Sequence, residues 1–343
     1  ASNYIHLLRK ALRKAGFQNV PVLSLNFSGL EKDSSLKFTV PMVRKALAAV
    51  FYGDELMSLS NQIRPYEHSP GTADALIAKW QAEIIAQFAA GRGMSKRDMK
   101  RNFEAIADDF AAIPFTKVPK VKVGIVGEIY VKYSPLGNSG LEAFLAAEGC
   151  EVNMPGLMGF VQYCIINGST DRQLYGGSQL VRKIYDLVMD FTTTREKLMI
   201  AAIKRHKNLH APALFMDTHA LAEGVIGYGA KMGEGWLLTA EMLELVKSGY
   251  PNIVCAQPFG CLPNHVVGKG MISKIRAMYP ETNITPIDYD PSATKVNQEN
   301  RIKLMIAVAK ERIDGAAAPV QLIVDDEESE AEVPVATSRK EVG

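Results

Sequence analysis

The chain has 343 residues, of which 47% are hydrophobic and 22% charged, and its net charge is +2. This composition is that of an ordinary globular protein, and the length allows two domains, each with its own core. No window of about 18 consecutive apolar residues predicts a membrane span, and no stripe of Lys and Arg with interleaved aromatic residues predicts nucleic-acid binding.

The charge is segregated along the sequence. Residues 325–332, DDEESEAE, hold six acidic residues, so the remainder of the chain is moderately basic. A basic body suits a small molecule that bears phosphate, or an acidic protein partner. We expect residues 315–343, which are rich in Ala, Pro and acidic residues, to form a disordered, solvated tail.

The first third of the chain is expected to be mainly helical, because apolar residues recur there at helical spacing. Helices are predicted over 3–15, 41–63, 72–90 and 96–112, and a short strand over 20–25. Pro114 and Pro119 mark a linker after them. These patterns predict a first domain, 1–117, that joins a partial α/β unit to a helical segment. The start inside a helical pattern, without Met, predicts a C-terminal piece of a longer protein.

After the linker the pattern changes to alternating strands and helices. Strands are predicted over 121–127, 150–152, 253–255 and 283–287, and helices over 141–148, 155–166, 176–209, 236–248, 264–278 and 292–313. This order predicts βαβ units and therefore a parallel sheet. The fold class is α/β, with Rossmann-like parallel sheets flanked by helices and a helical segment between two α/β parts. The second domain is expected to span 118–314.

The loop CAQPFGCLPNH, residues 255–265, holds two of the four cysteines and follows a predicted strand. Ligands of open α/β sheets bind at loops in this position. Two interpretations stay open: a soft-metal or redox site, or small core residues beside a tight turn. Cys150 and Cys164 are predicted to be core thiols. Four cysteines in a chain of this length do not make a disulfide framework, so a reducing cytoplasm is the expected compartment.

Other motifs give weaker signals. Gly124 and Gly127 do not complete a G-x-G-x-x-G fingerprint, and no P-loop, G-x-S-x-G, H-E-x-x-H or C-x-x-C motif is present. Glu128 directly follows a strand, where catalytic carboxylates often lie, although a plain polar residue at a strand end is the simpler interpretation. His219 has no nucleophile beside it in the sequence and is expected at the surface or in a capping role.

Several segments resemble one protein family. The runs VCAQPFGCLPNHVVGKGM (254–271), GEIYVKYSPLGNSGLEAFLAAEGCEV (127–152), GEGWLLTAEM (233–242) and 284–305 resemble the C-terminal part of the large acyl-CoA dehydratase activase-related proteins. The resemblance covers about residues 1–313. It implies similarity to 2-hydroxyacyl-CoA dehydratase and double-cubane cluster protein subunits. These bind iron–sulfur clusters through cysteines in stacked Rossmann-like domains. Their ATP-hydrolysing activase sends one low-potential electron into the cluster.

The resemblance implies a function for this chain. We expect part of an anaerobic, cytoplasmic iron–sulfur dehydratase or reductase, with an activase domain and an acyl-CoA or other small molecule as partners; a dimer is left open. Cys261, and less directly Cys255, are the implied ligands of an iron–sulfur cluster of the 4Fe–4S type. The other ligands would lie outside this chain, which alone is expected to be inactive.

The resemblance also implies roles for residues near the cysteine loop and in the first βα loop. Glu128 and Ser134 are the implied catalytic residues. Gly137, Asn138 and His265 are the implied cofactor-binding residues. Two alternatives remain: a non-catalytic docking domain for the activase, and a nucleotide-binding Rossmann enzyme.

Overall fold

The computed structural model describes residues 2–22, 39–290, 292 and 294–313. Residues 20–22 of the strand expected at 20–25 are described and are not in a strand, and residues 23–25 lie outside this part of the chain, as does the expected acidic tail. The described residues form one parallel sheet in the order β2-β1-β3-β4. Its strands are β1 (Lys122–Gly127), β2 (Glu151–Asn153), β3 (Asn252–Pro258) and β4 (Asn283–Tyr289). The predicted α/β class is therefore confirmed.

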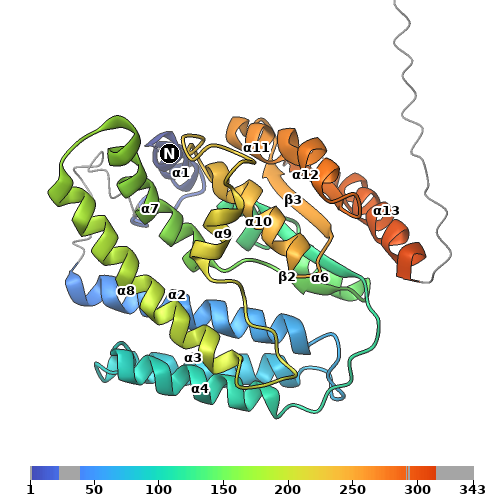
Figure 1. Ribbon diagram of the computed structural model, residues 1–343, viewed down its shortest axis with the longest axis horizontal. Helices are drawn as coiled ribbons and strands as arrows, with labels where there is room; N and C mark the ends of the chain where they lie inside the picture. The colour runs from blue at the N-terminus through green and yellow to red at the C-terminus, as the bar shows by residue number, and fades with distance from the viewer. Residues whose placement is uncertain (1, 23–38, 291, 293, 314–343) are drawn as a thin grey trace, which may run out of the picture.

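Helices cover both faces of the sheet (Figure 1). Along β3, Val254 and Ala256 contribute to one core, whereas Ile253 and Cys255 contribute to the core on the other face, because successive side chains of a strand alternate. The first face is covered by α6 (Leu141–Ala147) and α13 (Lys295–Ile313). The second is covered by α10 (Gly235–Lys247), α11 (Leu262–Val267) and α12 (Ile272–Met278).

A separate helical layer packs beside the sheet. Figure 1 shows α2, α3 and α4 grouped at the bottom of the view, with α7 and α8 running upward from them on the left. Its elements are α2 (Val40–Ile63), α3 (Thr72–Ala89), α4 (Lys96–Ala111), α7 (Leu157–Tyr175) and α8 (Gln179–Ile203). Buried residues of all five helices form one apolar core. This core therefore draws on residues from both sides of the boundary expected at residue 117.

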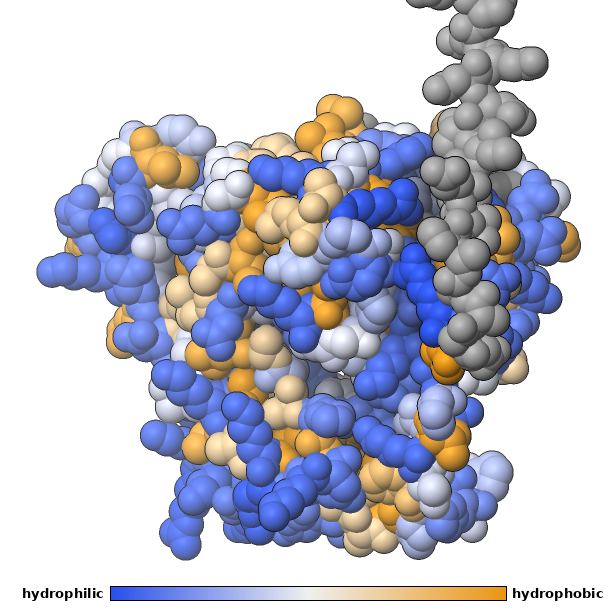
Figure 2. Space-filling view, turned by 45° about the vertical axis from the view of Figure 1, so that its right-hand side comes forward, coloured by the Kyte–Doolittle hydropathy of each residue, from blue (hydrophilic) through white to orange (hydrophobic). Residues whose placement is uncertain are grey.

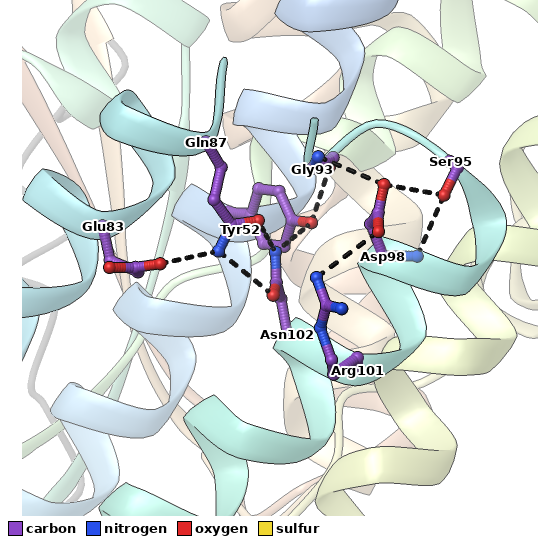
Figure 3. A network of polar contacts seen from close by, with 8 residues as sticks. All are labelled: Tyr52, Glu83, Gln87, Gly93, Ser95, Asp98, Arg101 and Asn102. Carbon is purple, nitrogen blue, oxygen red and sulfur yellow. Dashed lines mark hydrogen bonds and ion pairs between the residues drawn. The ribbon is translucent and has the colours of Figure 1, made fainter. Parts of the chain in front are cut away.

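A polar network ties α2, α3 and α4 together inside this layer (Figure 3). The Tyr52 hydroxyl donates to the Gly93 carbonyl at 2.7 Å and accepts from Asn102 Nδ2 at 2.9 Å. Asn102 Nδ2 also donates to Gln87 Oε1 at 2.8 Å. At the start of α4, Ser95 caps the helix by accepting from the Asp98 amide at 3.0 Å. The network satisfies polar groups that burial would otherwise leave without partners.

Some element predictions were wrong in detail. The helix expected over 264–278 is three pieces, α11, a 3-10 turn (Lys269–Met271) and α12, because the backbone of Gly268 at φ −97° and ψ −83° departs from helical geometry. A short helix, α5 (Ile129–Tyr133), lies just ahead of the expected loop. A second short helix, α9 (Phe215–Leu221), was not predicted. At the start of the chain, α1 (Ser2–Lys14) matches its expected position.

Polar side chains cover most of the face seen in Figure 2, and apolar residues are scattered over it in small groups. Scattered apolar residues are ordinary on a protein surface. No helix in the described part of the chain has the length and apolar character needed to cross a bilayer.

Candidate functional site

The sheet topology marks one place for a ligand site. After β1 the chain leads through α6 to β2 on one side of the sheet, whereas β3 and β4 lie on the other side. The loops that follow β1 and β3 therefore diverge at a topological switch point, where open α/β sheets bind ligands. We call this region the switch-point edge, meaning residues 127–131, 234 and 258–265.

Glu234 connects the two halves of the switch-point edge. Its Oε1 accepts from the backbone amide of Ile129, after β1, at 3.1 Å, and its Oε2 accepts from Asn264 Nδ2, after β3, at 2.8 Å. The residue is only 7% exposed. Gly235 follows at φ +47°, where a Cβ would lie 2.3 Å from the Tyr163 hydroxyl oxygen and 2.4 Å from the Ala230 carbonyl oxygen. Glu234 was not predicted from the sequence, where the glycines on either side of it were the available signal.

Glu128 lies at the end of β1, as the sequence predicted, and begins α5. Its Oε2 accepts from the Val131 amide at 2.9 Å, which makes it the N-cap of that helix. Gly127, just before it, has φ +146°, and a Cβ there would lie 1.8 Å from the Ala256 carbonyl oxygen. Burial raises the pKa of Glu128, and the negative charge of Glu234 contributes in the same direction. The carboxyl group can therefore hold a proton at a higher pH than an exposed glutamic acid.

Cys261 is the accessible thiol of the cysteine loop. It is half-buried, lies at the N-cap position of α11, and its Sγ accepts from Asn264 Nδ2 at 3.2 Å. Asn264 is completely buried, and its Oδ1 has no hydrogen-bond partner among the described residues. One amide group thus links Cys261 to Glu234.

Cys255 has a different environment from Cys261. It lies within β3, completely buried, in the core between the sheet and α10 to α12. A Cβ built on Gly268 would lie 3.2 Å from the Sγ of Cys255. The backbone at the C-terminal end of α11 therefore packs directly against this thiol. Burial raises the pKa of Cys255 to about 12. The structure therefore does not bring the two thiols to the same accessible surface.

The three other predicted site residues of the first βα loop, Ser134, Gly137 and Asn138, form hydrogen bonds within that loop. Asn138 donates from Nδ2 to the carbonyls of Val131 and Lys132, and its Oδ1 accepts from the amides of Gly140 and Leu141. Its side chain is therefore fully engaged within the loop. The Ser134 hydroxyl oxygen accepts from the Gly137 amide at 3.2 Å. These contacts place Ser134, Gly137 and Asn138 in one turn after α5.

His265 lies on α11, and its Nε2 is 3.8 Å from Asp288 Oδ1. Asp288 also accepts from Gln257 Nε2 at 2.7 Å, at the ends of β4 and β3. His265 is thus next to the cysteine loop, and the carboxylate it approaches is already engaged.

Two predictions outside this region need correction, and one is confirmed. Cys150 is buried, as expected, and burial raises its pKa to about 11. Cys164 was expected in the core but is exposed on α7. His219 was expected at the surface or in a cap, yet its ring stacks on Tyr228 at 4.2 Å and lies edge-on to Trp236 at 4.9 Å. Burial lowers its pKa, so it is a neutral member of an aromatic cluster.

The cluster implied by the resemblance can be tested against these residues. In the described part of the chain, no three His, Cys, Asp or Glu side chains are grouped so that they could hold a metal ion. Cys261 fits a single thiolate ligand, because it is accessible and receives a hydrogen bond on its sulfur. Cys255 does not fit, because it is sealed in the core. The described residues therefore fit one ligand of a shared cluster and not a complete cluster site.

Comparison of the chain with protein-family models, with curated proteins and with solved structures gives no match. Function is therefore inferred from the geometry of the switch-point edge and from the motif resemblance around it.

Proposed function

We infer that this chain is part of an iron–sulfur protein related to the 2-hydroxyacyl-CoA dehydratases and reductases. In this role Cys261 is the one ligand that the described residues supply to a cluster completed from outside them. The cluster, when bound, supplies one-electron chemistry driven by an ATP-hydrolysing activase. The observation that carries the proposal is the accessible Cys261 thiol at the switch point, with Asn264 donating to its sulfur.

Glu128 is assigned a role as proton carrier in the same reaction. It lies across the switch point from Cys261, and Glu234 is bound to the segments that hold both. Burial raises the pKa of Glu128, which suits a carboxyl group that carries a proton to a leaving group. Loss of water from a 2-hydroxyacyl group needs a proton for the leaving hydroxide, and Glu128 is suited to deliver it. The acyl-CoA is the proposed substrate class.

The cysteine inventory supports a reducing compartment. All four cysteines are free thiols, and none is paired in a disulfide. We place the protein in the cytoplasm, where an oxygen-sensitive cluster and unpaired thiols are both maintained.

The ligand assignment is tested by anaerobic reconstitution of the full chain with ferrous iron, sulfide and excess 2-mercaptoethanol. The small thiol supplies the thiolates that the described residues lack. We expect the protein to retain iron and sulfide through gel filtration in the same thiol buffer and to show charge-transfer absorbance. Cys261→Ser should lose most of the bound iron, because the only accessible thiol at the switch-point edge is removed.

Two matched controls separate this role from general thiol chemistry. Cys164→Ser removes an exposed thiol on α7, and Cys255→Ser removes a buried one next to the loop. Both should retain iron at the wild-type level, provided that circular dichroism shows them folded. Failure of the wild type to retain iron, or full iron content in Cys261→Ser, would overturn the assignment.

A further inference from the structure

A cavity of about 300 Å³ lies between the helical layer and the sheet. The helical layer contributes residues of α2, α7 and α8 to its lining, and the opposite wall comes from β2, the turn after it, α9 and α10. Glu128, Glu234, Cys261 and Asn264 are not among the lining residues, so the cavity is separate from the switch-point edge. Cavities of this volume that lie between packed layers are common ligand sites.

The apolar part of the cavity wall is rich in methionine. Unbranched, polarizable methionine side chains adapt to aliphatic ligands of varied shape. The lining methionines are Met57, Met154, Met158 and Met199, and Phe51 and Phe215 add aromatic surface.

Four acidic side chains also line the cavity, and only one has a cationic partner. Glu241 pairs with Lys132 Nζ at 3.0 Å. Asp54 accepts from two backbone amides, both at 2.8 Å, and Glu196 accepts from the Gln162 side chain at 2.9 Å and from a backbone amide. Glu244 accepts from the Ser248 hydroxyl at 2.6 Å. The charge of Lys132 also reaches Asp54 and Glu244, although it forms no ion pair with either. Among the four lining carboxyl groups, Glu196 is the one on which no positive group of the described residues acts.

Two basic residues, Lys122 and His210, belong to the lining. The Lys122 ammonium, at the start of β1, is positioned over the ring of Tyr250, with 5.3 Å to the ring centroid. His210 is exposed to solvent. The charge of the cavity is thus negative when its carboxyl groups are ionised.

Thr218 adds a polar group to the cavity wall. It lines the cavity and is 9% exposed, and its hydroxyl makes no hydrogen bond to any described residue. The hydroxyl oxygen is not one of the fully buried atoms that lack a partner, so it is accessible and can bond a ligand. Gly159 lines the same cavity, and a Cβ built on it meets no atom within 4 Å, so space is open beside α7.

We propose that this cavity binds a small primary amine with an aliphatic body. The ammonium group would be accepted by Asp54 and Glu196, and the hydrocarbon would lie against the methionines. An ammonium ion offers three donors and a positive charge, which suits carboxylates held only by neutral donors. An alcohol of the same length lacks the charge, and a carboxylate has the wrong one. The proposal is independent of the function inferred for Cys261.

Isothermal titration of the full chain with three probes of equal chain length tests this proposal. The probes are pentylamine, 1-pentanol and pentanoate. We expect pentylamine to bind about tenfold more tightly than 1-pentanol or better, because charge-assisted hydrogen bonds are roughly twice as strong as neutral ones. Pentanoate should show no binding. Equal affinities for the three probes, or no heat with pentylamine, would overturn the proposal.

Variants locate the site. Gly159→Met fills the open space beside α7 and should abolish pentylamine binding, whereas Glu196→Gln should weaken it about tenfold. Gly53→Met is the matched control: Gly53 is a helical glycine on the exposed side of α2, also with no atom within 4 Å of a built Cβ, and does not line the cavity. It should bind like the wild type. Wild-type affinity in a folded Gly159→Met protein would contradict the assignment.

Discussion

At the scale of single residues, Asp54 combines burial with a capping role. Its carboxylate accepts from the amides of Leu157 and Met158, the first residues of α7, and burial raises its pKa to about 6 despite these bonds. Gly156 makes the approach possible, since a Cβ there would lie 2.6 Å from Asp54 Oδ2. A carboxyl whose pKa is higher in the folded than in the unfolded state stabilises the fold in its protonated form.

The burial of Asp54 makes the free energy of unfolding depend on pH, and this contribution can be measured separately. The contribution of Asp54 is complete below its unfolded pKa of about 4 and is lost as the pH rises through about 6. The loss amounts to at most about 3 kcal/mol. In Asp54→Asn the group no longer titrates, so the free energy of unfolding should fall less between these two pH values than in the wild type.

Urea unfolding at several pH values checks this prediction by difference. Other buried carboxyl groups also have raised pKa values and titrate in both proteins, namely those of Glu55, Glu196, Glu241 and Glu244. The charge of Asp54 is the smallest of the causes that act on Glu196. The weaker cap provided by Asn adds a constant offset, which cancels in the pH dependence. Parallel stability curves for the two proteins would show that Asp54 does not titrate as argued.

The sequence could predict some residues of the site and not others. Cys261 and Glu128 were identifiable because each follows a predicted strand, and the ends of neighbouring parallel strands meet. Cys255 was left between ligand and core, and only the packing of Gly268 on its sulfur decides between them. Asp54 gave no local signal, because its partner Leu157 lies 103 residues away in the chain. Glu234 had only its flanking glycines as a signal, since Ile129 and Asn264 lie 105 and 30 residues away.

At the scale of elements, the Tyr52 hydroxyl connects α2 to α4 and to the turn before it (Figure 3). Tyr52→Phe should lower the free energy of unfolding by about 1–3 kcal/mol, because the Gly93 carbonyl and one Asn102 N–H lose a buried partner. Chemical denaturation measures the change. Tyr130→Phe is the control, since Tyr130 is 58% exposed. A loss as small as that of the control would mean that solvent replaces the missing bonds.

Helices and strands could be predicted where a hydrophobic pattern runs over many residues. They could not be predicted where a short element depends on a single contact. The strand at 121–127 and the helices at 41–63 and 72–90 match β1, α2 and α3 closely, because buried runs and helical spacing identify them. The strand at 253–255 was placed correctly but is shorter than β3, which spans Asn252–Pro258. Helix α5 has five residues, too few for a period, and begins where Glu128 caps it. The contribution of α7 and α8 to the helical core depends on tertiary packing, which sequence order does not contain.

At the scale of the whole molecule, α7 and α8 join two halves, the helical layer and the α/β part that contains the sheet and α10. Helix α7 contributes Met158 to the helical core and Tyr163 to a second cluster around Trp236. Helix α8 contributes Met199 to the first and Met189 to the second. A further link is Glu151 of β2, which is buried and accepts from the hydroxyls of Tyr66 and Tyr250. Neither half can lose its packing without exposing apolar surface of the other.

The fluorescence of the two tryptophans reports on the helical layer and on the part around α10 separately. Trp80 packs in the helical core, and Trp236, on α10, packs in a cluster with residues of α7, α8 and α9. In Trp236→Phe and Trp80→Phe, fluorescence therefore follows one half, whereas far-UV circular dichroism follows all helices. Because α7 and α8 belong to both cores, we expect the two signals to coincide in urea within each variant, as in a cooperative transition. A fluorescence midpoint that departs from the circular dichroism midpoint in either variant would show that the halves unfold independently.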